Sequence, residues 1–168
     1  MSKSEKINSV RSLLISIQGA RLLLPSAVVA EITPYKKINN TGHKIIGSMP
    51  PWLLQVIEWR GQNIPLISLE KILSLPLAPP TDESHVVVFY GLEFIQITPF
   101  YAIMAATIPH ILSVSENDLT AERDIKRNGL VFSAKLNEKD TVFLPDVNFF
   151  ENLLRKSQVA AQLFLSKK

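Results

Sequence analysis

The chain has 168 residues, with 18 lysine and arginine residues, 15 aspartate and glutamate residues and no cysteine. This length fits one domain or two small coupled ones, and the lack of cysteine excludes disulfides and any site or reaction that needs a thiolate. The net charge of +3 is spread along the chain without a basic stripe, which argues against a nucleic-acid-binding protein.

The first part of the chain predicts a tail and then short strands. Residues 1–10 are polar and charged, so we expect a disordered tail and no secretory signal. Leu13 to Leu24 predicts a hairpin, because apolar residues alternate loosely on both sides of a turn at Gly19. Ala27 to Ile32 predicts a short strand or a helical turn leading into one, and Glu31 is the polar residue within this apolar run.

The stretch from Pro50 to Leu69 predicts the central hairpin of the protein. Gly61, with Gln62 and Asn63, supplies the turn between two runs rich in β-favouring residues. Pro65 lacks an N–H group, so we expect its strand to lie at a sheet edge or to bulge there. Trp59 and Arg60 precede the turn, and a guanidinium held flat beside a large ring keeps its planar fork free for a carboxylate or a carbonyl.

The second part of the chain predicts a short helix followed by more strands. Leu69 to Leu75 has helical spacing of its apolar residues. Residues 75–84 contain three prolines and predict the break between two halves of the protein. The strands expected after this break are His85 to Tyr90, a return from Leu92 to Ile97 after Gly91, Ala102 to Ile108, and His110 to Val114.

The last part predicts a loop, a hairpin and a helix. Ser115 to Asn128 is charged and loop-like, and Gly129 opens a hairpin that runs to Leu144. Asp146 is placed to cap a helix, because its carboxylate can accept backbone N–H bonds at the helix start. We expect this helix to continue as an extension over residues 155–168.

One uncharged stretch, from Phe94 to Ser115, is long enough to cross a bilayer. It contains Pro99 and Pro109, which are poor helix material, so we interpret it as buried strands and turns and expect no membrane insertion. The pattern as a whole is about ten short strands with few long helices, which favours a mainly-β fold of small antiparallel barrels over a parallel sheet.

No reaction is indicated by the sequence. His43, His85 and His110 are far apart and lack the spacing of metal ligands, so we expect no metal site. No nucleophile elbow and no glycine-rich nucleotide-binding loop is present, so we expect neither a catalytic residue nor a cofactor.

Several motifs resemble the CheW-like family, the coupling proteins of bacterial chemosensory arrays. The resemblance covers Leu13 to Leu154, and the Trp at position 59 is similar to the pilus-associated PilI and ChpC branch. The motifs that carry it are Leu24-Pro25, Val29-Ala30-Glu31-Ile32, Pro50-Pro51, Glu58-Trp59-Arg60-Gly61, Ile64-Pro65-Leu66-Ile67-Ser68-Leu69 and Pro145-Asp146-Val147.

The resemblance implies a fold and a function. The fold would be two small SH3-like five-stranded β-barrels packed around a shared core within residues 11–154, with a C-terminal helix. The function would be that of a cytoplasmic adaptor that is not an enzyme. It would join the cytoplasmic tip of a methyl-accepting chemoreceptor to a CheA-type histidine kinase in chemotaxis or twitching motility, and other CheW-like proteins are further candidate partners.

The candidate partner-binding residues are Glu31, Trp59, Arg60, Gly61 and Pro65. Arg60 could face a partner, or it could bond local carbonyls and hold the barrels together. Glu31 could face solvent or belong to a receptor-contacting groove, and Trp59 could be a core residue or line an interface. A small β-barrel module for nucleic acid is the alternative function, and it would need exposed aromatics interleaved with lysines on one sheet face.

Overall fold

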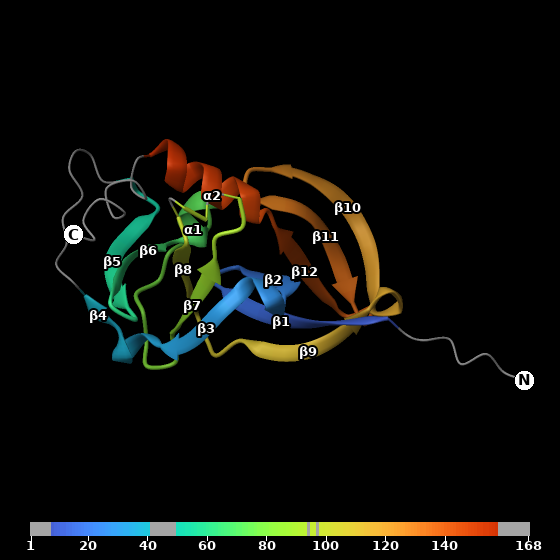
Figure 1. Cartoon of the computed structure of the whole chain (residues 1–168). Coiled ribbons are helices and arrows are strands. Elements are labelled where there is room, and N and C mark those ends of the chain that lie inside the picture. Colours follow the sequence, from blue (N-terminus) through green and yellow to red (C-terminus); the bar gives the residue numbers. More distant parts are fainter. Residues whose placement is uncertain (1–7, 41–49, 94, 97, 158–168) are drawn as a thin grey trace, which may run out of the picture.

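The computed structural model describes residues 8–40, 50–93, 95–96 and 98–157, in which the strands form two six-stranded sheets (Figure 1). Sheet A has the order β10 (Leu119–Arg127), β11 (Leu130–Leu136), β12 (Asp140–Pro145), β2 (Ala20–Pro25), β1 (Ser9–Ile17) and β9 (His110–Ser115). Sheet B has the order β3 (Val29–Pro34), β7 (His85–Tyr90), β8 (Phe100–Ala105), β6 (Gln62–Ile67), β5 (Leu53–Trp59) and β4 (Asn39–Asn40).

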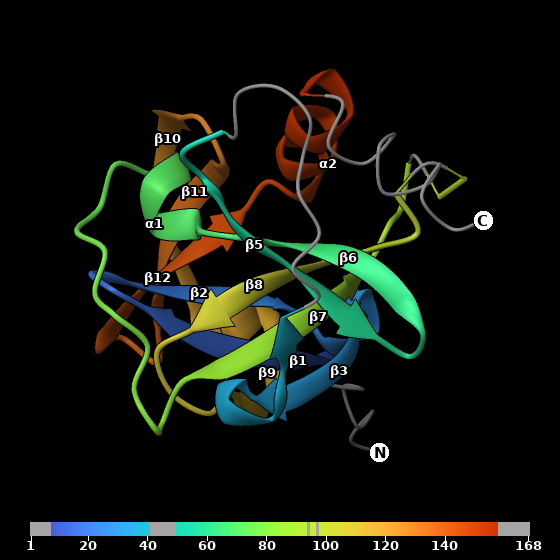
Figure 2. The same cartoon turned by 90° about the vertical axis from the view of Figure 1, so that its left-hand side faces the viewer.

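Short helices connect the strands or cover the junction between the sheets. They are η1 (Ser26–Val28), η2 (Tyr35–Lys37), α1 (Leu69–Ile72), η3 (Glu116–Asp118) and α2 (Val147–Lys156). The helices α1 and α2 both lie in the upper half of the molecule in both views, with α2 at the top and α1 lower, among the strands (Figures 1 and 2). Leu69 of α1 and Leu154 of α2 belong to the largest apolar cluster, so both helices close the core between the sheets.

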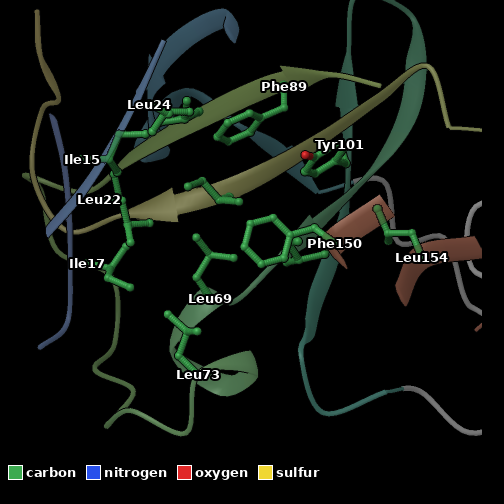
Figure 3. Packing of buried hydrophobic residues seen from close by; sticks show 14 of the residues in the cluster. Ile15, Ile17, Leu22, Leu24, Leu69, Leu73, Phe89, Tyr101, Phe150 and Leu154 are labelled. Atoms are coloured by element: carbon green, nitrogen blue, oxygen red, sulfur yellow. The ribbon is translucent and has the colours of Figure 1, made fainter. Parts of the chain in front are cut away.

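The strands near this junction bury both of their faces. In β7, Val87 and Phe89 belong to the large cluster between the sheets, which we call the shared core, while Val86 and Val88 point into a separate cluster inside sheet B. The same alternation separates the shared-core residues of β1 from Leu14, which packs on a third cluster inside sheet A. Figure 3 shows how the shared core gathers side chains from both sheets and both helices. This arrangement confirms the expected shared core.

Two glutamates are buried at the junction. Glu70 of α1 accepts bonds from the Gln18 backbone N–H at 3.1 Å and from the Ser68 hydroxyl at 3.1 Å, so it connects α1 to the β1–β2 turn. Glu151 of α2 is buried as well, and burial together with this carboxylate raises the pKa of Tyr101 far above its ordinary value. Tyr101 is therefore held in its neutral form.

The connection between β7 and β8 is fixed by α2 and by a close backbone contact. The Glu151 Oε1 atom accepts the backbone N–H bonds of Leu92 at 2.7 Å and Glu93 at 3.1 Å. The Gly91 N–H donates to the Pro99 carbonyl at 2.8 Å, and a Cβ atom at position 91 would lie 1.8 Å from the Thr98 carbonyl oxygen. Only glycine fits this approach.

Many of the predicted elements are confirmed. The hairpin from Leu13 to Leu24 is β1 and β2, the central hairpin is β5 and β6, and the hairpin that follows Gly129 is β11 and β12. The predicted strands at His85 and His110 are β7 and β9. Asp146 caps α2 as expected, because its side chain accepts the Phe149 N–H at 3.2 Å.

Two segments were assigned wrongly. The predicted strand from Leu92 to Ile97 is not a strand in its described residues, because Glu151 takes the N–H groups of Leu92 and Glu93. The predicted loop from Ser115 to Asn128 contains β10, whose charged sequence hid a strand that pairs along β11 at the edge of sheet A. Charged residues are common on edge strands, so a charged run does not exclude one.

The proline-rich segment 75–84 does not separate the two sheets. It connects α1 to β7, and both its neighbouring strands, β6 and β7, belong to sheet B. The chain passes between the sheets at the β2–β3 and β8–β9 connections instead. Proline marks a loop but carries no information about which sheet receives the next strand.

The predicted details of the central hairpin need two corrections. The turn consists of Arg60 and Gly61, both with positive φ, and Gln62 already belongs to β6. Pro65 lies in an interior strand between β5 and β8 and not at a sheet edge, but β5 does bulge beside it, between Leu53 and Gln55. Its missing N–H is tolerated there because the parallel pairing of β6 with β8 begins only at Leu66.

The ends of the chain are partly described. Residues 1–7 of the expected tail lie outside the described residues, and β1 already begins at Ser9. At the other end, α2 ends at Lys156, and residues 158–168 of the expected helical extension also lie outside the described residues.

Candidate partner-binding site

The β5–β6 turn presents an arginine at the end of sheet B. Arg60 has φ 48° and Gly61 has φ 75°, the pair of positive values that a tight two-residue hairpin turn requires. A Cβ atom at Gly61 would meet nothing within 4 Å, so glycine is favoured there by its backbone conformation and not by lack of space. Positive φ is uncommon for arginine, and this conformation holds Arg60 at the tip of the hairpin.

Glu31 joins the residues of this turn from the other side of sheet B. Its Oε2 atom lies 3.7 Å from the Arg60 Nε atom and accepts the indole N–H of Trp59. The Arg60 guanidinium carbon lies 4.6 Å from the centre of the Trp59 ring. Because β3 and β5 are four places apart in the sheet order, the sheet must curl for these side chains to meet. We call Glu31, Trp59 and Arg60 the Glu31–Arg60 cluster.

The members of this cluster differ in exposure. The side chain of Arg60 is 64% exposed and that of Glu31 is 40% exposed, while Trp59 is buried. An ion pair in such contact with water contributes about 0–1 kcal/mol to the free energy of unfolding. The carboxylate also satisfies the buried indole donor, and the Trp59 ring supports the guanidinium from one side. The cluster therefore orders Arg60 without removing it from solvent.

Aromatic rings continue from the cluster across sheet B. The Trp59 and Phe100 ring centres are 4.7 Å apart, and those of Phe100 and Tyr90 are 5.8 Å apart, both with tilted planes. Tyr90 is 43% exposed at the far end of this row. The row does not match the pattern required by the nucleic-acid alternative, because its first ring is buried and the rings pack on one another.

A groove between the two sheets begins at Glu31. It has a volume of about 330 Å³ and is lined mainly by apolar side chains from β1, β3 and β9, with a charged residue from each sheet. Its lining residues are Arg11, Leu13, Ser26, Val29, Ala30, Glu31, Ile32 and Ile111. Glu31 thus takes part both in the groove and in the cluster at the turn.

The structure brings together four of the five predicted site residues. Glu31, Trp59, Arg60 and Gly61 lie at one end of sheet B, whereas Pro65 is buried within β6 and serves the hairpin itself. Sequence reasoning missed the groove residues on sheet A, above all Ile111. No local pattern could identify them, because the groove forms only where β9 and β3 approach from different sheets.

The family of the chain follows from a comparison with known domain families. The model of the CheW-like domain matches residues 11–152. The chain belongs to this family. CheW-like domains are scaffolds that carry out no catalysis, which agrees with the expectation that the chain is not an enzyme. No curated protein matches the chain significantly.

A solved structure shows the same fold. The scaffolding protein TtCheW from Thermoanaerobacter tengcongensis superimposes with a TM-score of 0.66 at 17% sequence identity, covering 83% of this chain and 90% of that one. The mainly-β fold of this CheW-like protein, with two curled sheets and a short helix near the C-terminus, matches the two SH3-like β-barrels of CheW. The expected mainly-β fold class is confirmed, but the predicted five strands per barrel are corrected to six, because the two-residue strand β4 extends sheet B and β9 pairs with β1 at the edge of sheet A.

Within the described part of the chain, no three histidine, aspartate or glutamate side chains lie close enough to hold a metal ion. None of the helices described is long and apolar enough to span a membrane.

Proposed function

We propose that this CheW-like protein is a cytoplasmic coupling adaptor that connects the cytoplasmic tip of a methyl-accepting chemoreceptor to a CheA-type histidine kinase. The observation that carries the proposal is the Glu31–Arg60 cluster, which shares Glu31 with the groove between the sheets. Its residues come from strands far apart in the chain and combine an ordered, solvent-facing guanidinium with an apolar channel.

This combination suits the binding of a helix. An amphipathic helix binds in a groove by burying its apolar face, and the groove offers Val29, Ile32 and Ile111 to such a face. The Arg60 guanidinium then meets a carboxylate or a helix-end carbonyl of the receptor with its planar set of donors. The Trp59 ring restricts the guanidinium before binding, which reduces the entropy lost when the complex forms.

A structural role of Arg60 is the competing interpretation. Its contact with Glu31 bridges β3 and the β5–β6 turn, so it could serve to close sheet B. The two roles predict different balances between binding and stability, because an exposed ion pair contributes little to the free energy of unfolding.

The test is to replace Arg60 by alanine and measure both properties. We expect binding to the receptor tip to weaken at least tenfold, while the thermal midpoint changes by less than about 4 °C. Arg21→Ala is the matched control, because Arg21 is another half-exposed arginine, paired with Asp140 at 3.4 Å at a distance from the groove. Its binding to the receptor tip should equal that of the unaltered protein.

Two results would contradict the proposal. A large fall in the midpoint of Arg60→Ala would assign the residue to the closure of sheet B. Unchanged receptor binding in a correctly folded Arg60→Ala protein would remove the cluster from the interface altogether.

The kinase and the output of the pathway need experiments in the native cell. We propose that a CheA-type kinase and a chemoreceptor co-purify with this protein, together with other CheW-like proteins. We also propose that the protein belongs to the pilus-associated branch, because the tryptophan at position 59 resembles that branch. Deletion of the gene should then impair twitching, and loss of swimming alone would place the protein in another branch.

A further inference from the structure

The two sheets end in four edge strands, and these edges differ in their protection. Sheet A ends in β9 and β10, and sheet B ends in β3 and β4. An edge strand presents unpaired backbone groups that can take up another strand, and proteins usually guard against this with charges, prolines, bulges or very short strands.

Three of these edges carry such protection. The β10 edge has two register shifts against β11 and contains Glu122, Arg123, Asp124, Lys126 and Arg127. The β3 edge has a register shift between Val29 and Glu31 and ends at Pro34. The β4 edge is only two residues long.

The β9 strand itself, His110–Ser115, contains none of these features, although Pro109 directly precedes it. No residue from Thr107 to Ser115 carries a formal charge, and the pairing of β9 with β1 runs from Leu14–His110 to Ser9–Ser115 without a register shift. Two large apolar side chains are exposed along it, Ile111 at 56% and Ile108 at 57%. Figure 1 shows β9 running along the outside of sheet A, beyond β1. This edge is therefore suited to accept a strand.

We propose that β9 pairs in antiparallel fashion with β9 of a second copy of this chain. A second copy fits because a two-fold axis brings identical edges together antiparallel. The uncharged edge then places no formal charge opposite a like charge, whereas self-pairing of β10 would bring a densely charged strand against itself. The two copies of sheet A would join into one continuous sheet.

The register of this pairing follows from the geometry of strands. Residues directly opposite each other in an antiparallel pair point to the same face of the sheet. The two-fold axis must therefore lie where one residue of β9 is opposite the same residue of the second copy. An axis at Leu112 places Ile111 opposite Ser113 of the second copy and His110 opposite Val114. The two Ile111 side chains then lie diagonally across the axis on one face, within reach of each other.

The strength of the dimer follows from its size. A six-residue strand pair with one isoleucine per copy buries far less surface than a standard interface of about 1,600 Å². We therefore expect a weak dimer that forms in the micromolar to millimolar range of concentration. The inference does not depend on the proposed adaptor function, and its test contains no receptor or kinase.

The experiment is sedimentation of the purified full-length chain over a series of concentrations. The apparent mass should rise from monomer towards dimer, and Ile111→Lys should weaken dimerisation at least tenfold, because it places a charge on the edge of each copy. Val131→Lys is the matched control, since Val131 is 49% exposed on β11, a strand already paired on both sides. This variant should dimerise like the unaltered chain.

Hydrogen exchange identifies the strand involved. Backbone amides of β9 should become more protected as the concentration rises, while those of β10 should not change. A chain that stays monomeric up to about 1 mM overturns the proposal, and so does equal loss of dimer in Ile111→Lys and Val131→Lys. Protection of β9 that does not vary with concentration also overturns it, because another part of the same chain would then cover the edge.

Discussion

Sheet B contains two connections that each depend on a glycine and a glutamate, yet they serve opposite purposes. After β5, Gly61 takes a positive φ in open space, and Glu31 contacts the neighbouring Arg60. After β7, Gly91 lies against the Thr98 carbonyl, and Glu151 accepts the N–H groups that follow it. Similar residues thus build one connection at the surface and another within the packed structure.

The difference between the two glutamates lies in what surrounds them. The Glu31 side chain is 40% exposed and its guanidinium partner is 64% exposed, so water competes for both charges. Glu151 is fully buried and its backbone donors lie on a loop that α2 holds in place. The exposed pair can exchange partners at low cost, whereas the buried carboxylate cannot leave its donors without a large loss of stability. Exposure therefore separates the proposed binding site from an architectural contact.

The largest expected effect is at the buried connection. Gly91→Ala would place a methyl group 1.8 Å from the Thr98 carbonyl oxygen, which is a backbone atom, and Glu151 of α2 holds the N–H groups that follow Gly91. We expect the free energy of unfolding to fall by about 3 kcal/mol or more, measured by denaturant titration. Gly61→Ala is the matched control, and its cost should be about 1 kcal/mol, because only the positive φ opposes it. Equal losses in both variants would contradict this contrast between the two connections.

A smaller effect is expected from the glutamates themselves. Glu151→Ala leaves the N–H groups of Leu92 and Glu93 without their acceptor and opens a cavity beneath α2, so we expect a loss of about 2–4 kcal/mol in the free energy of unfolding. Glu31→Ala should cost only about 1 kcal/mol, most of it from the indole donor of Trp59.

Receptor binding should reverse this order for the two glutamates. We expect Glu31→Ala to weaken it, and Glu151→Ala to leave it unchanged in whatever fraction remains folded. If receptor binding fell in proportion to the free energy of unfolding in both variants, the two connections would not differ in function.

The smallest effect concerns pH and a third connection, between β9 and β10. The Asp118 carboxylate accepts the Ser115 backbone N–H at 2.8 Å and its hydroxyl at 2.9 Å, and these bonds lower the pKa of Asp118 below its ordinary value. Because the pKa is lower in the folded state, the ionised carboxylate stabilises the fold at any pH above the ordinary pKa of an aspartate. This stabilisation is lost as the pH falls through the lowered pKa of the folded state.

The check is a series of thermal midpoints in acid. Asp118→Asn should have a slightly lower midpoint than the unaltered chain near neutral pH, and the two midpoints should converge once the pH falls below the lowered pKa of Asp118. Asp140→Asn, at an exposed aspartate paired with Arg21, is the control for a general effect of charge. If the difference in midpoint between Asp118→Asn and the unaltered chain grew as the pH fell, the pKa of Asp118 would not be lowered in the folded state.

Local chemistry explains which elements were predicted correctly. Alternating apolar residues identified the strands of the central hairpin, and the acceptor at Asp146 identified the start of α2. The motifs around Glu31 and Arg60 were sufficient to suggest the family and, through it, the fold class. They could not show that Trp59 bonds Glu31, because that contact requires sheet B to curl.

The sequence by itself determined most of the strands, the helix cap and the family, because each depends on residues a few positions apart. Only the tertiary structure decided that β1 and β2 join the C-terminal strands in sheet A, and that residues 75–84 connect two elements of sheet B. It also decided that Glu31 lies at a groove and Glu151 beneath a loop. Strands that bury both faces carry an apolar pattern that does not specify their neighbours, so strand pairing and the exposure of each glutamate depend on the folded chain as a whole.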